Sequence, residues 1–346
     1  GSGKTVTITS SYSGADVSNY SVTNQSSTTA DISTKALTAT ASASNKTYNA
    51  TNSASVTMTL SGLIGSETLG STNTSTFNNK NVGTGKTVTV NSITLADGTN
   101  GGLAANYSIS AGQTTTANIT AKSLTVSGIT ASNKTYDGNS VASLDASSVA
   151  YSGLVSGHTL NTTFIGAFLD KNVGTGKTVT ITPTYSGSDV SNYSITNHAD
   201  VTANITAKSL TVSGVTASDK TYDSTVTATM DASSSAVYSA LVDGDDFTGS
   251  YSGVFANANV ANGKGVTITS SYSGADVSNY NITDQTSTTA NISAKALTAT
   301  ASASNKVYDG SSAATSTLTL SGFVGSETVT STNSSTFNNK NAGTGK

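Results

Sequence analysis

The chain repeats itself, and this periodicity constrains its fold more than any other feature. A recurring phrase, Asn/Asp-Lys-Thr/Val-Tyr, ends in tyrosines that are 88, 86 and 86 residues apart. These tyrosines are Tyr48, Tyr136, Tyr222 and Tyr308. A second phrase, Asn-Tyr, recurs with spacings of 87, 86 and 87 residues, at Tyr20, Tyr107, Tyr193 and Tyr280. A unit of about 86 residues is too long for one solenoid turn and suits a small independent domain.

A longer period of 260 residues is superimposed on the short one. Residues 3–20 match residues 263–280 at 17 of 18 positions, and residues 35–46 recur unchanged at 295–306. Near-identity at this distance indicates that three units were copied together as a cassette. We therefore interpret the sequence as a window from a longer array.

The markers divide the chain into five segments. They are residues 1–34 (the end of a repeat), 35–121 (repeat 1), 122–207 (repeat 2), 208–294 (repeat 3) and 295–346 (the start of repeat 4). The two incomplete segments should be complementary halves of one domain with unpaired sheet edges. Continuation into a longer protein is favoured, and chains that join head to tail by sharing a split domain are the alternative.

Apolar and polar residues alternate with period two through each unit, as in Thr87–Val90, Thr178–Thr182 and Gly265–Thr269. This period is typical of half-buried strands, and no segment keeps helical spacing over three turns. Asn100-Gly101 and Asn262-Gly263 predict tight turns between strands. The predicted fold is all-β: tandem small β-sandwich or β-grasp-like domains of about 86 residues, arranged as an extended rod.

Two repeats should meet almost directly, because residues 117–126 alternate without a Gly or Pro. Ile119 and Leu124 should both be buried, in neighbouring domains, with fewer than about five loop residues between their strands. The predicted core of repeat 2 is Leu124, Val126, Leu144, Leu154, Val155, Phe164, Phe168, Val173, Val179, Ile181, Tyr193, Ile195 and Ile205.

Composition excludes several classes of function. The chain has 16 Lys, no Arg, a net charge of −3 and no basic cluster, which argues against nucleic-acid binding. It has no Cys, so thiolate zinc sites and cysteine nucleophiles are absent. No apolar run approaches the roughly 18–20 residues that span a bilayer. With two Glu and two His, we expect neither an enzyme nor a bound cofactor.

Acidic side chains are the weak candidates for a metal site. Asp243, Asp245 and Asp246 form the densest cluster and carry oxygen ligands suited to Ca²⁺. The equivalent loops of other repeats lack these acids, so a solvated turn is favoured, and removing divalent cations should change melting little. Three further acids follow the recurrent tyrosines and are expected to bond turn backbones rather than a cation. They are Asp137, Asp223 and Asp309.

Other polar features favour structural roles. The segment Val82–Val88 contains Gly-Thr-Gly-Lys-Thr but lacks the spacing of a phosphate-binding loop, and a hairpin loop is predicted. Asp16 is expected to cap one short helical or 3₁₀ turn. His158 and His198 are expected at the surface. An intramolecular isopeptide bond, with Asp as the acid, is a minor alternative.

The phrase Asn133–Gly138, Asn-Lys-Thr-Tyr-Asp-Gly, resembles the YDG-type repeats of bacterial surface proteins, and the Lys-x-Leu-Thr starts are similar to MBG repeats. Tyr48-Asn49-Ala50 and Tyr222-Asp223-Ser224 depart from the signature. The resemblance implies a place in large filamentous-haemagglutinin-like adhesins at the cell surface or outside the cell.

Two functions remain open. The first is a structural stalk or fibre that acts as a repetitive extracellular spacer, with neighbouring repeats of the same or an adjacent chain as partners. The second is a glycan- or surface-binding array that contributes to adhesion or biofilm matrix, with a host, bacterial or matrix surface as partner. The second needs an exposed aromatic platform.

Overall fold

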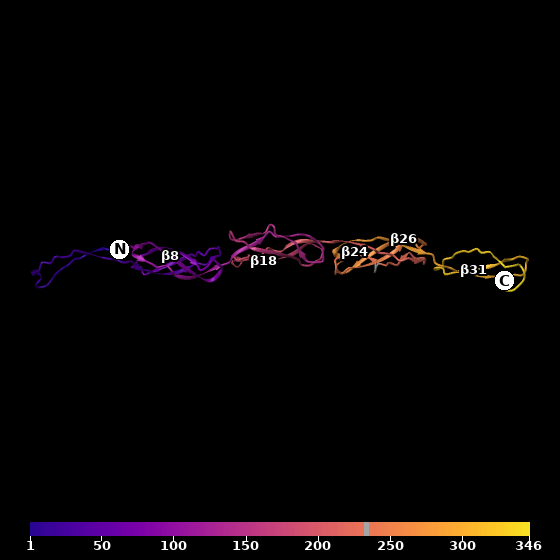
Figure 1. Ribbon diagram of the computed structural model, residues 1–346, viewed down its shortest axis with the longest axis horizontal. Helices are drawn as coiled ribbons and strands as arrows, with labels where there is room; N and C mark the ends of the chain where they lie inside the picture. Colours follow the sequence, from indigo (N-terminus) through magenta and orange to yellow (C-terminus); the bar gives the residue numbers. More distant parts are fainter. Residues whose placement is uncertain (232–234) are drawn as a thin grey trace. The chain divides into compact units, whose positions relative to one another are not determined.

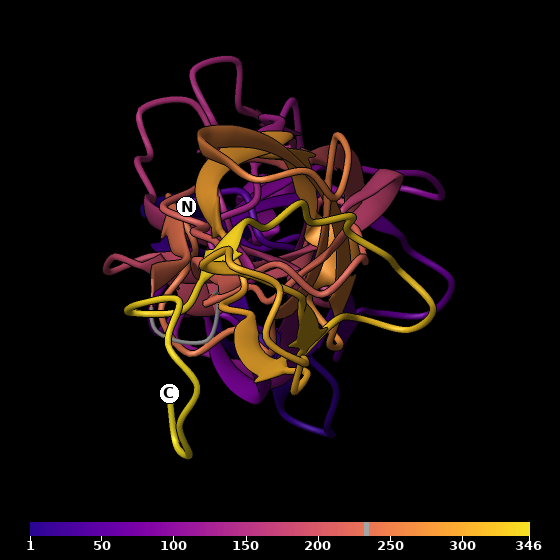
Figure 2. The same cartoon turned by 90° about the vertical axis from the view of Figure 1, so that its right-hand side faces the viewer.

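The computed structural model describes residues 1–231 and 235–346, and strands joined by loops and short 3₁₀ turns dominate its ribbon (Figures 1 and 2). The all-β class predicted from the period-two alternation is therefore confirmed. In the described part of the chain, no helix has the length and apolar character required to cross a membrane.

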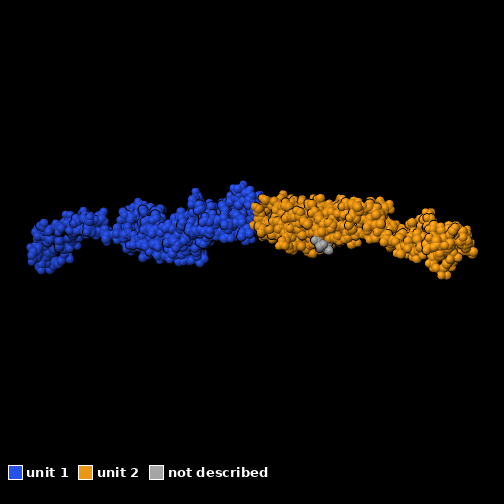
Figure 3. Space-filling view, turned by 45° about the vertical axis from the view of Figure 1, so that its right-hand side comes forward, with its two compact units in different colours: residues 1–130, 144–165, 181–200 blue, residues 131–143, 166–180, 201–346 orange. Residues whose placement is uncertain are grey.

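The chain divides into two compact units (Figure 3). Unit 1 comprises residues 1–130, 144–165 and 181–200, and unit 2 comprises residues 131–143, 166–180 and 201–346. Repeat 2 contributes residues to both units, whereas repeat 3 lies wholly in unit 2.

Repeat 3 shows the architecture of one complete repeat as two sheets. The first has the strand order β22-β28-β26-β25-β23, and the second has the order β24-β21-β27. Their elements are β21 (Lys208–Ser213), β22 (Lys220–Thr221), β23 (Thr227–Ala228), β24 (Val237–Ser239), β25 (Thr248–Phe255), β26 (Ala261–Ser273), η4 (Val277–Asn279), β27 (Tyr280–Thr283) and β28 (Ser287–Ser293). Val212 on β21 and Ile268 on β26 share one buried cluster, so the sheets pack face to face as a sandwich.

The first and last strands of repeat 3 both make parallel pairs. β21 pairs parallel with β27, and β22 pairs parallel with β28, whereas the β25–β26–β28 ladder is antiparallel. The amino- and carboxyl-terminal strands of the repeat are thus held in different sheets.

Repeat 2 has the same two strand orders, β13-β20-β18-β17-β14 and β16-β11-β19. Its elements are β11 (Lys122–Ser127), β12 (Thr130–Ala131), β13 (Lys134–Thr135), β14 (Val141–Ala142), β15 (Leu144–Asp145), β16 (Ala150–Ser152), β17 (Asn161–Phe168), β18 (Gly174–Ser186), η3 (Val190–Asn192), β19 (Tyr193–Thr196) and β20 (Val201–Thr206). Of the thirteen predicted core residues, seven are buried and six are half-buried, so the core prediction is confirmed for the seven. Tyr136, Ile129 and Asn192 are buried as well.

Repeat 1 keeps the antiparallel hairpin of the long strands. Its elements are β3 (Lys35–Ala36), β4 (Thr38–Ala43), β5 (Lys46–Thr47), β6 (Val56–Ser61), β7 (Leu69–Phe77), β8 (Gly83–Asp97), η2 (Ala104–Asn106), β9 (Tyr107–Ser108) and β10 (Thr114–Thr120). The incomplete segments hold β1 (Lys4–Thr7), η1 (Val17–Asn19), β2 (Ser27–Ala30), β29 (Thr298–Ala303), β30 (Ala313–Ala314), β31 (Ser316–Ser321) and β32 (Ser335–Thr336).

One turn prediction is confirmed and two are wrong. Asn100 and Gly101 both have positive φ, 56° and 90°, as a tight turn requires. Val82–Val88 is not a hairpin loop, because β8 already begins at Gly83. Asn262-Gly263 likewise lies inside β26 rather than in a turn.

The glycines of the two wrong turn predictions belong to a recurring β-bulge at the start of each long strand. Gly85, Gly176 and Gly263 each have φ of 60°, and the register of the strand pair shifts beside each one. Their amides donate to the side-chain oxygens of Asn118, Asn204 and Asn291 at 2.8, 2.7 and 2.8 Å. A positive φ at an unpaired residue is the geometry of a bulge, and it favours glycine.

Candidate functional site

The last strand of one repeat runs almost directly into the first strand of the next, and we call each such place a joint. In the first joint one residue separates β10 from β11, and in the second one residue separates β20 from β21. Ile119 is 1% exposed and Leu124 is 0% exposed, on either side of the first joint. The predicted burial and short linker are therefore confirmed.

The first joint contains a core that two repeats share. Tyr48, Phe77 and Ile119 of repeat 1 belong to the same buried cluster as Leu124 and Tyr193 of repeat 2. All of these residues lie in unit 1. The apolar surface that a small domain leaves uncovered is thus buried against its neighbour.

The signature phrase builds the upstream face of each joint. Asn45, Asn133 and Asp219 accept the amides of Asn118, Asn204 and Asn291 of the last strand, each at 2.7 Å. The following lysines lie over phenylalanine rings and donate to carbonyls of the next turn. They are Lys46, Lys134 and Lys220. These bonds fix the phrase, so its tyrosine is presented towards the next repeat.

In the first joint, Tyr48 reaches three side chains of repeat 2. Its hydroxyl donates to Asp189 Oδ1 at 3.2 Å, and its ring packs edge-on against Tyr193 at 5.8 Å between centroids. The ring of His158 lies 6.0 Å away, and His158 Nδ1 is 2.8 Å from the Tyr193 hydroxyl. Lys80 adds an ion pair with Asp189 at 3.4 Å.

The second joint uses the same positions with stronger charge pairing. The Tyr136 hydroxyl donates to Asp245 Oδ1 and Oδ2, both at 2.9 Å, and its ring meets Tyr280 edge-on at 5.6 Å. Lys171 Nζ lies 2.8 Å from Asp245 Oδ1 and 2.9 Å from Asp276 Oδ1. The ammonium group of Lys171 is therefore held between two carboxylates of the next repeat.

These contacts keep the charged groups ionised. Bonds to Asp245, Asp276 and Tyr136 raise the pKa of Lys171 above its usual range, and the bond from Lys171 lowers the pKa of Asp276. Burial alone would raise the pKa of Asp245, but bonds from Lys171, Tyr280 and Tyr136 outweigh it and lower that pKa. An isopeptide bond needs a neutral amine and a protonated acid, so this ionic arrangement opposes one.

Tyrosine ionisation is disfavoured at the same places. Burial, followed by the bond to Asp189, raises the pKa of Tyr48 to about 12. Burial, followed by the bond to Asp245, raises the pKa of Tyr280 to about 12. The hydroxyls therefore remain donors to carboxylates throughout the physiological range.

A buried asparagine closes each of these two joints. Asn192 Oδ1 accepts the Val82 amide at 2.8 Å in the first joint, and Asn279 Oδ1 accepts the Val173 amide at 2.9 Å in the second. Both asparagines end a 3₁₀ turn that begins after an aspartate. The turn thus supplies both an acid and an amide to the preceding repeat.

The expected role of Asp16 is only half correct. Residues 17–19 do form a 3₁₀ turn, but no side-chain bond from Asp16 caps it. The same holds for Asp189 and Asp276, whose side chains face the joint instead. In repeats 2 and 3, the carboxylate before the turn therefore binds the preceding repeat.

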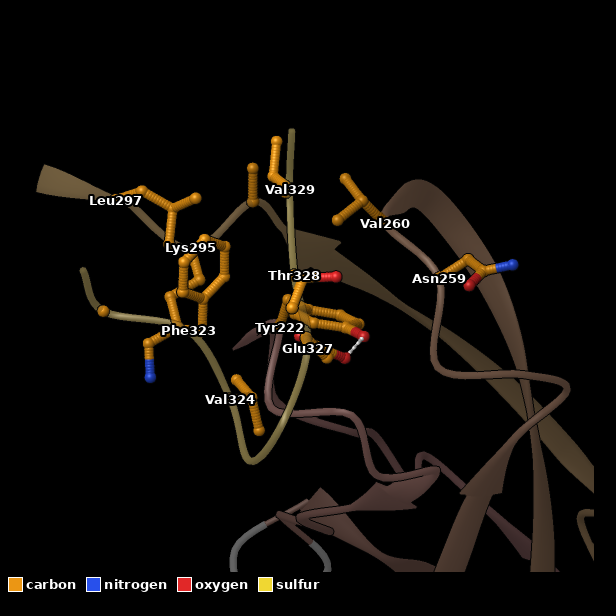
Figure 4. Close-up of a pocket in the computed structure, with 12 residues that line it drawn as sticks. Tyr222, Asn259, Val260, Lys295, Leu297, Phe323, Val324, Glu327, Thr328 and Val329 are labelled. Atoms are coloured by element: carbon orange, nitrogen blue, oxygen red, sulfur yellow. Dashed lines mark hydrogen bonds between the residues drawn. The ribbon is translucent and has the colours of Figure 1, made fainter. Parts of the chain in front are cut away.

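The third joint, between repeats 3 and 4, differs from the others, because four residues separate β28 from β29. Tyr222 donates to Glu327, and a cavity of about 530 Å³ beside them is lined by Val260, Phe323 and Leu297 (Figure 4). Ala258 stands three residues after Phe255, where repeats 1 and 2 have Lys80 and Lys171.

The three aspartates proposed as weak metal candidates differ in exposure and in hydrogen-bond partners. Asp243 is exposed, as a solvated turn predicts, but the side chain of Asp245 is only 2% exposed. The prediction of a solvated turn is wrong for Asp245, because Lys171, Tyr136 and Tyr280 occupy its oxygens. Asp246 Oδ2 accepts the Ala275 amide at 2.9 Å within repeat 3. No group of three or more metal-binding side chains occurs among the described residues.

The two histidines and the recurrent aspartates have different outcomes. His158 is wrongly predicted to lie at the surface, since its side chain is 11% exposed and faces Tyr48. His198 is half-buried and bonds the carbonyl of Ala199. The predicted turn bonding of the recurrent aspartates is confirmed, because each accepts the amide two residues later. They are Asp137, Asp223 and Asp309.

The joint residues are the functional set that sequence reasoning missed. Lys171 and Asp245 are 74 residues apart and belong to different repeats, so no local pattern relates them. The sequence offered one signal, namely the equivalent position of polar residues in successive repeats. His158, Asp245 and Glu327 occupy the same loop position, and the structure pairs them with the recurrent tyrosines of the preceding repeats.

Comparisons with known proteins agree with the internal periodicity. A family model described as YDG domain matches residues 33–117, 120–203, 206–289 and 293–346. Each match begins two residues before a recurring Lys-x-Leu phrase. The comparison with curated proteins found no match.

Proposed function

This chain belongs to the YDG domain family, and from that premise we propose that it is a structural stalk or fibre segment of a large secreted bacterial surface adhesin. In this role the repeats act as an extracellular spacer, and each repeat is the partner of the next. The observation that carries the proposal is the shared core of the first joint, in which Leu124 and Tyr193 pack with Tyr48 and Ile119.

The joints suit a stiff spacer. A linker of one residue leaves little freedom for bending, and a buried tyrosine with several cross-repeat hydrogen bonds resists rotation. Flexible domain linkers have the opposite composition, with exposed Gly, Ser and Pro and few contacts across the boundary.

The strand pairing of a repeat suits tension along the chain. In repeat 3, β21 and β28 are the terminal strands, and each makes a parallel pair with another strand. When the two ends are pulled apart, the hydrogen bonds of a parallel pair are loaded in shear and must break together. A stalk that transmits force needs this resistance.

The surface location is part of the same proposal. It is supported by the resemblance of the Asn-Lys-Thr-Tyr-Asp-Gly phrase to stalk repeats of filamentous-haemagglutinin-like adhesins. A glycan- or surface-binding role has less support, because none of the described Tyr and Phe residues in 35–294 is exposed. An aromatic platform for sugars is therefore missing from the complete repeats that the structure describes.

Small-angle X-ray scattering of the purified chain tests the proposal. We expect the distance distribution of an extended rod whose cross-section is that of a single repeat. Insertion of a Gly-Ser linker between Thr206 and Ala207 should introduce a bend and shorten the mean end-to-end distance. A compact, globular profile for the unmodified chain, or one unaffected by the insertion, would argue against a stiff spacer.

A further inference from the structure

The residue that stands three positions after the phenylalanine of the upstream face differs between joints. It is Lys80 in repeat 1, Lys171 in repeat 2 and Ala258 in repeat 3. Each lysine contacts an aspartate that precedes the 3₁₀ turn of the next repeat, Asp189 at 3.4 Å and Asp276 at 2.9 Å.

The repeat type that follows Ala258 differs at the facing position. Repeat 4 has the sequence of the repeat 1 type. Its residues 295–306 are identical to 35–46, and Glu327 occupies the position that Glu67 has in repeat 1. In repeat 1, where the corresponding turn is described, Leu103 precedes the turn and is 50% exposed. Residues 3–20, which lead into repeat 1, match residues 263–280 of repeat 3. By this correspondence, the repeat type that carries Ala258 is followed by the type that carries Leu103 before its turn.

A mismatch at this position leaves a charge without its partner. Asp276 is 8% exposed as a residue, and its Oδ1 faces Lys171. Without the lysine, two partly buried carboxylates, Asp245 and Asp276, would face each other uncompensated. Conversely, a lysine that faces a leucine loses its counter-charge. Such penalties discriminate between partners more strongly than the attraction alone.

We propose that this position selects the repeat that can follow: a repeat with lysine accepts a neighbour with aspartate before its 3₁₀ turn, and a repeat with alanine accepts a neighbour with an apolar residue there. The side chains at each joint are then matched to the order in which the covalent chain places the repeats. The inference rests on the joint contacts and does not depend on the stalk function.

Hydrogen exchange of two amides in the full chain tests the proposal. The Val173 amide reports the second joint, and the Val82 amide reports the first as an internal control. Lys171→Met should speed exchange of Val173 by roughly tenfold to a hundredfold, since a charge-assisted bond contributes about 1.5–3 kcal/mol. Exchange of Val82 should change less than about twofold, because distant sites act independently.

A double-mutant cycle separates selection from local damage. Asp276→Asn, which keeps the size of the side chain, should also speed Val173 exchange, although it lies in the other repeat. Exchange in the double variant should be accelerated by less than the product of the two single effects, because only Asp245 then lacks the lysine, whereas Lys171→Met alone leaves both carboxylates without it. Lys177→Ala, which removes an ion pair with Asp170 inside repeat 2, is the matched control and should leave Val173 unchanged.

Two further outcomes decide the case. Lys171→Arg keeps the charge and should retain most of the protection of Val173. Two results would show that the position does not select its neighbour. In the first, the double variant accelerates Val173 exchange by the full product of the two single effects. In the second, Val82 and Val173 respond equally to Lys171→Met.

Discussion

Tyrosine hydroxyls at the joints donate to carboxylates, and this choice of partner links the stability of a repeat to that of its neighbour. Tyr136 is 1% exposed, and its hydroxyl lies 2.9 Å from both oxygens of Asp245. A phenylalanine in repeat 2 would keep the apolar contact with Tyr280 but would leave the carboxylate of repeat 3 short of a donor. The hydroxyl is therefore the part of this residue that is specific to the joint.

Tyr136→Phe should destabilise the second joint by about 1–3 kcal/mol, because the buried carboxylate of Asp245 loses one of its three donors. Hydrogen exchange at the Val173 amide measures the loss at that joint. Tyr185→Phe makes the same change at a hydroxyl that bonds Asn197 within repeat 2, and it should cost less. Equal effects of the two substitutions would contradict a special role for Tyr136.

The same joint should respond to acid. The pKa values of Asp245 and Asp276 are lowered from the ordinary 3.8 in the folded chain. A lowered folded-state pKa contributes stability that is present above the unfolded value and is lost as the pH falls through the folded value. Protection of the Val173 amide, corrected for intrinsic exchange, should therefore decrease as the pH falls below about 4. An Asp245→Asn variant should show a flatter profile, and identical profiles would exclude the carboxylate as the cause.

At the scale of single elements, the long strands depend on a bulge that sequence reasoning placed in a loop. Gly263 in β26 has φ of 60° and no atom within 4 Å of a Cβ built on it, so a side chain there would meet backbone strain but no clash. Gly265 in the same strand has no positive φ and equally open surroundings. The two glycines separate conformational strain from the loss of a glycine as such.

Gly263→Ala should destabilise repeat 3 by about 1–2 kcal/mol, the usual cost of the left-handed region for a residue with a Cβ. Gly265→Ala should be neutral or slightly stabilising, because a strand gains from losing glycine. Chemical denaturation of the two variants gives the comparison. If Gly263→Ala costs no more stability than Gly265→Ala, the bulge tolerates a Cβ and the predicted strain is absent.

The strands at a joint should fail together. Ile119 on β10 is 1% exposed and packs in the cluster that contains Leu124 and Tyr193 of repeat 2. Ile119→Asp should cost about 3–5 kcal/mol, since it removes a large buried side chain and buries a charge. Hydrogen exchange should then increase in repeat 1 and on the adjoining face of repeat 2, while repeat 3 stays protected. Ile165→Asp is the control, because Ile165 on β17 is 66% exposed; uniform loss of protection along the chain would contradict nearest-neighbour coupling.

At the scale of the whole molecule, the repeat length, the all-β class and the short linker of the first joint were predictable, whereas the polar side-chain pairs across the joints were not. Alternation of Val and Ile with Thr places Val179 and Ile181 on a core face by local geometry alone. Asp245 was assigned to solvent because its partners Lys171 and Tyr136 belong to the preceding repeat. The bulge was missed for a related reason, since Gly176 is explained only by the amide oxygen of Asn204, 28 residues later.

Mechanical unfolding of the full chain joins these scales in one prediction. Each complete repeat has about 86 residues, so its unfolding should add roughly 300 Å of contour length at about 3.5 Å per residue, less its folded length. Terminal strands that are loaded in shear should give discrete force peaks rather than a gradual extension. Because the first joint shares a core between repeats, Ile119→Asp should lower the force of the adjoining repeats and leave one peak unchanged. Single-molecule pulling of both proteins measures these steps, and a single step several times longer than one repeat would show that the repeats unfold as one body rather than as coupled domains.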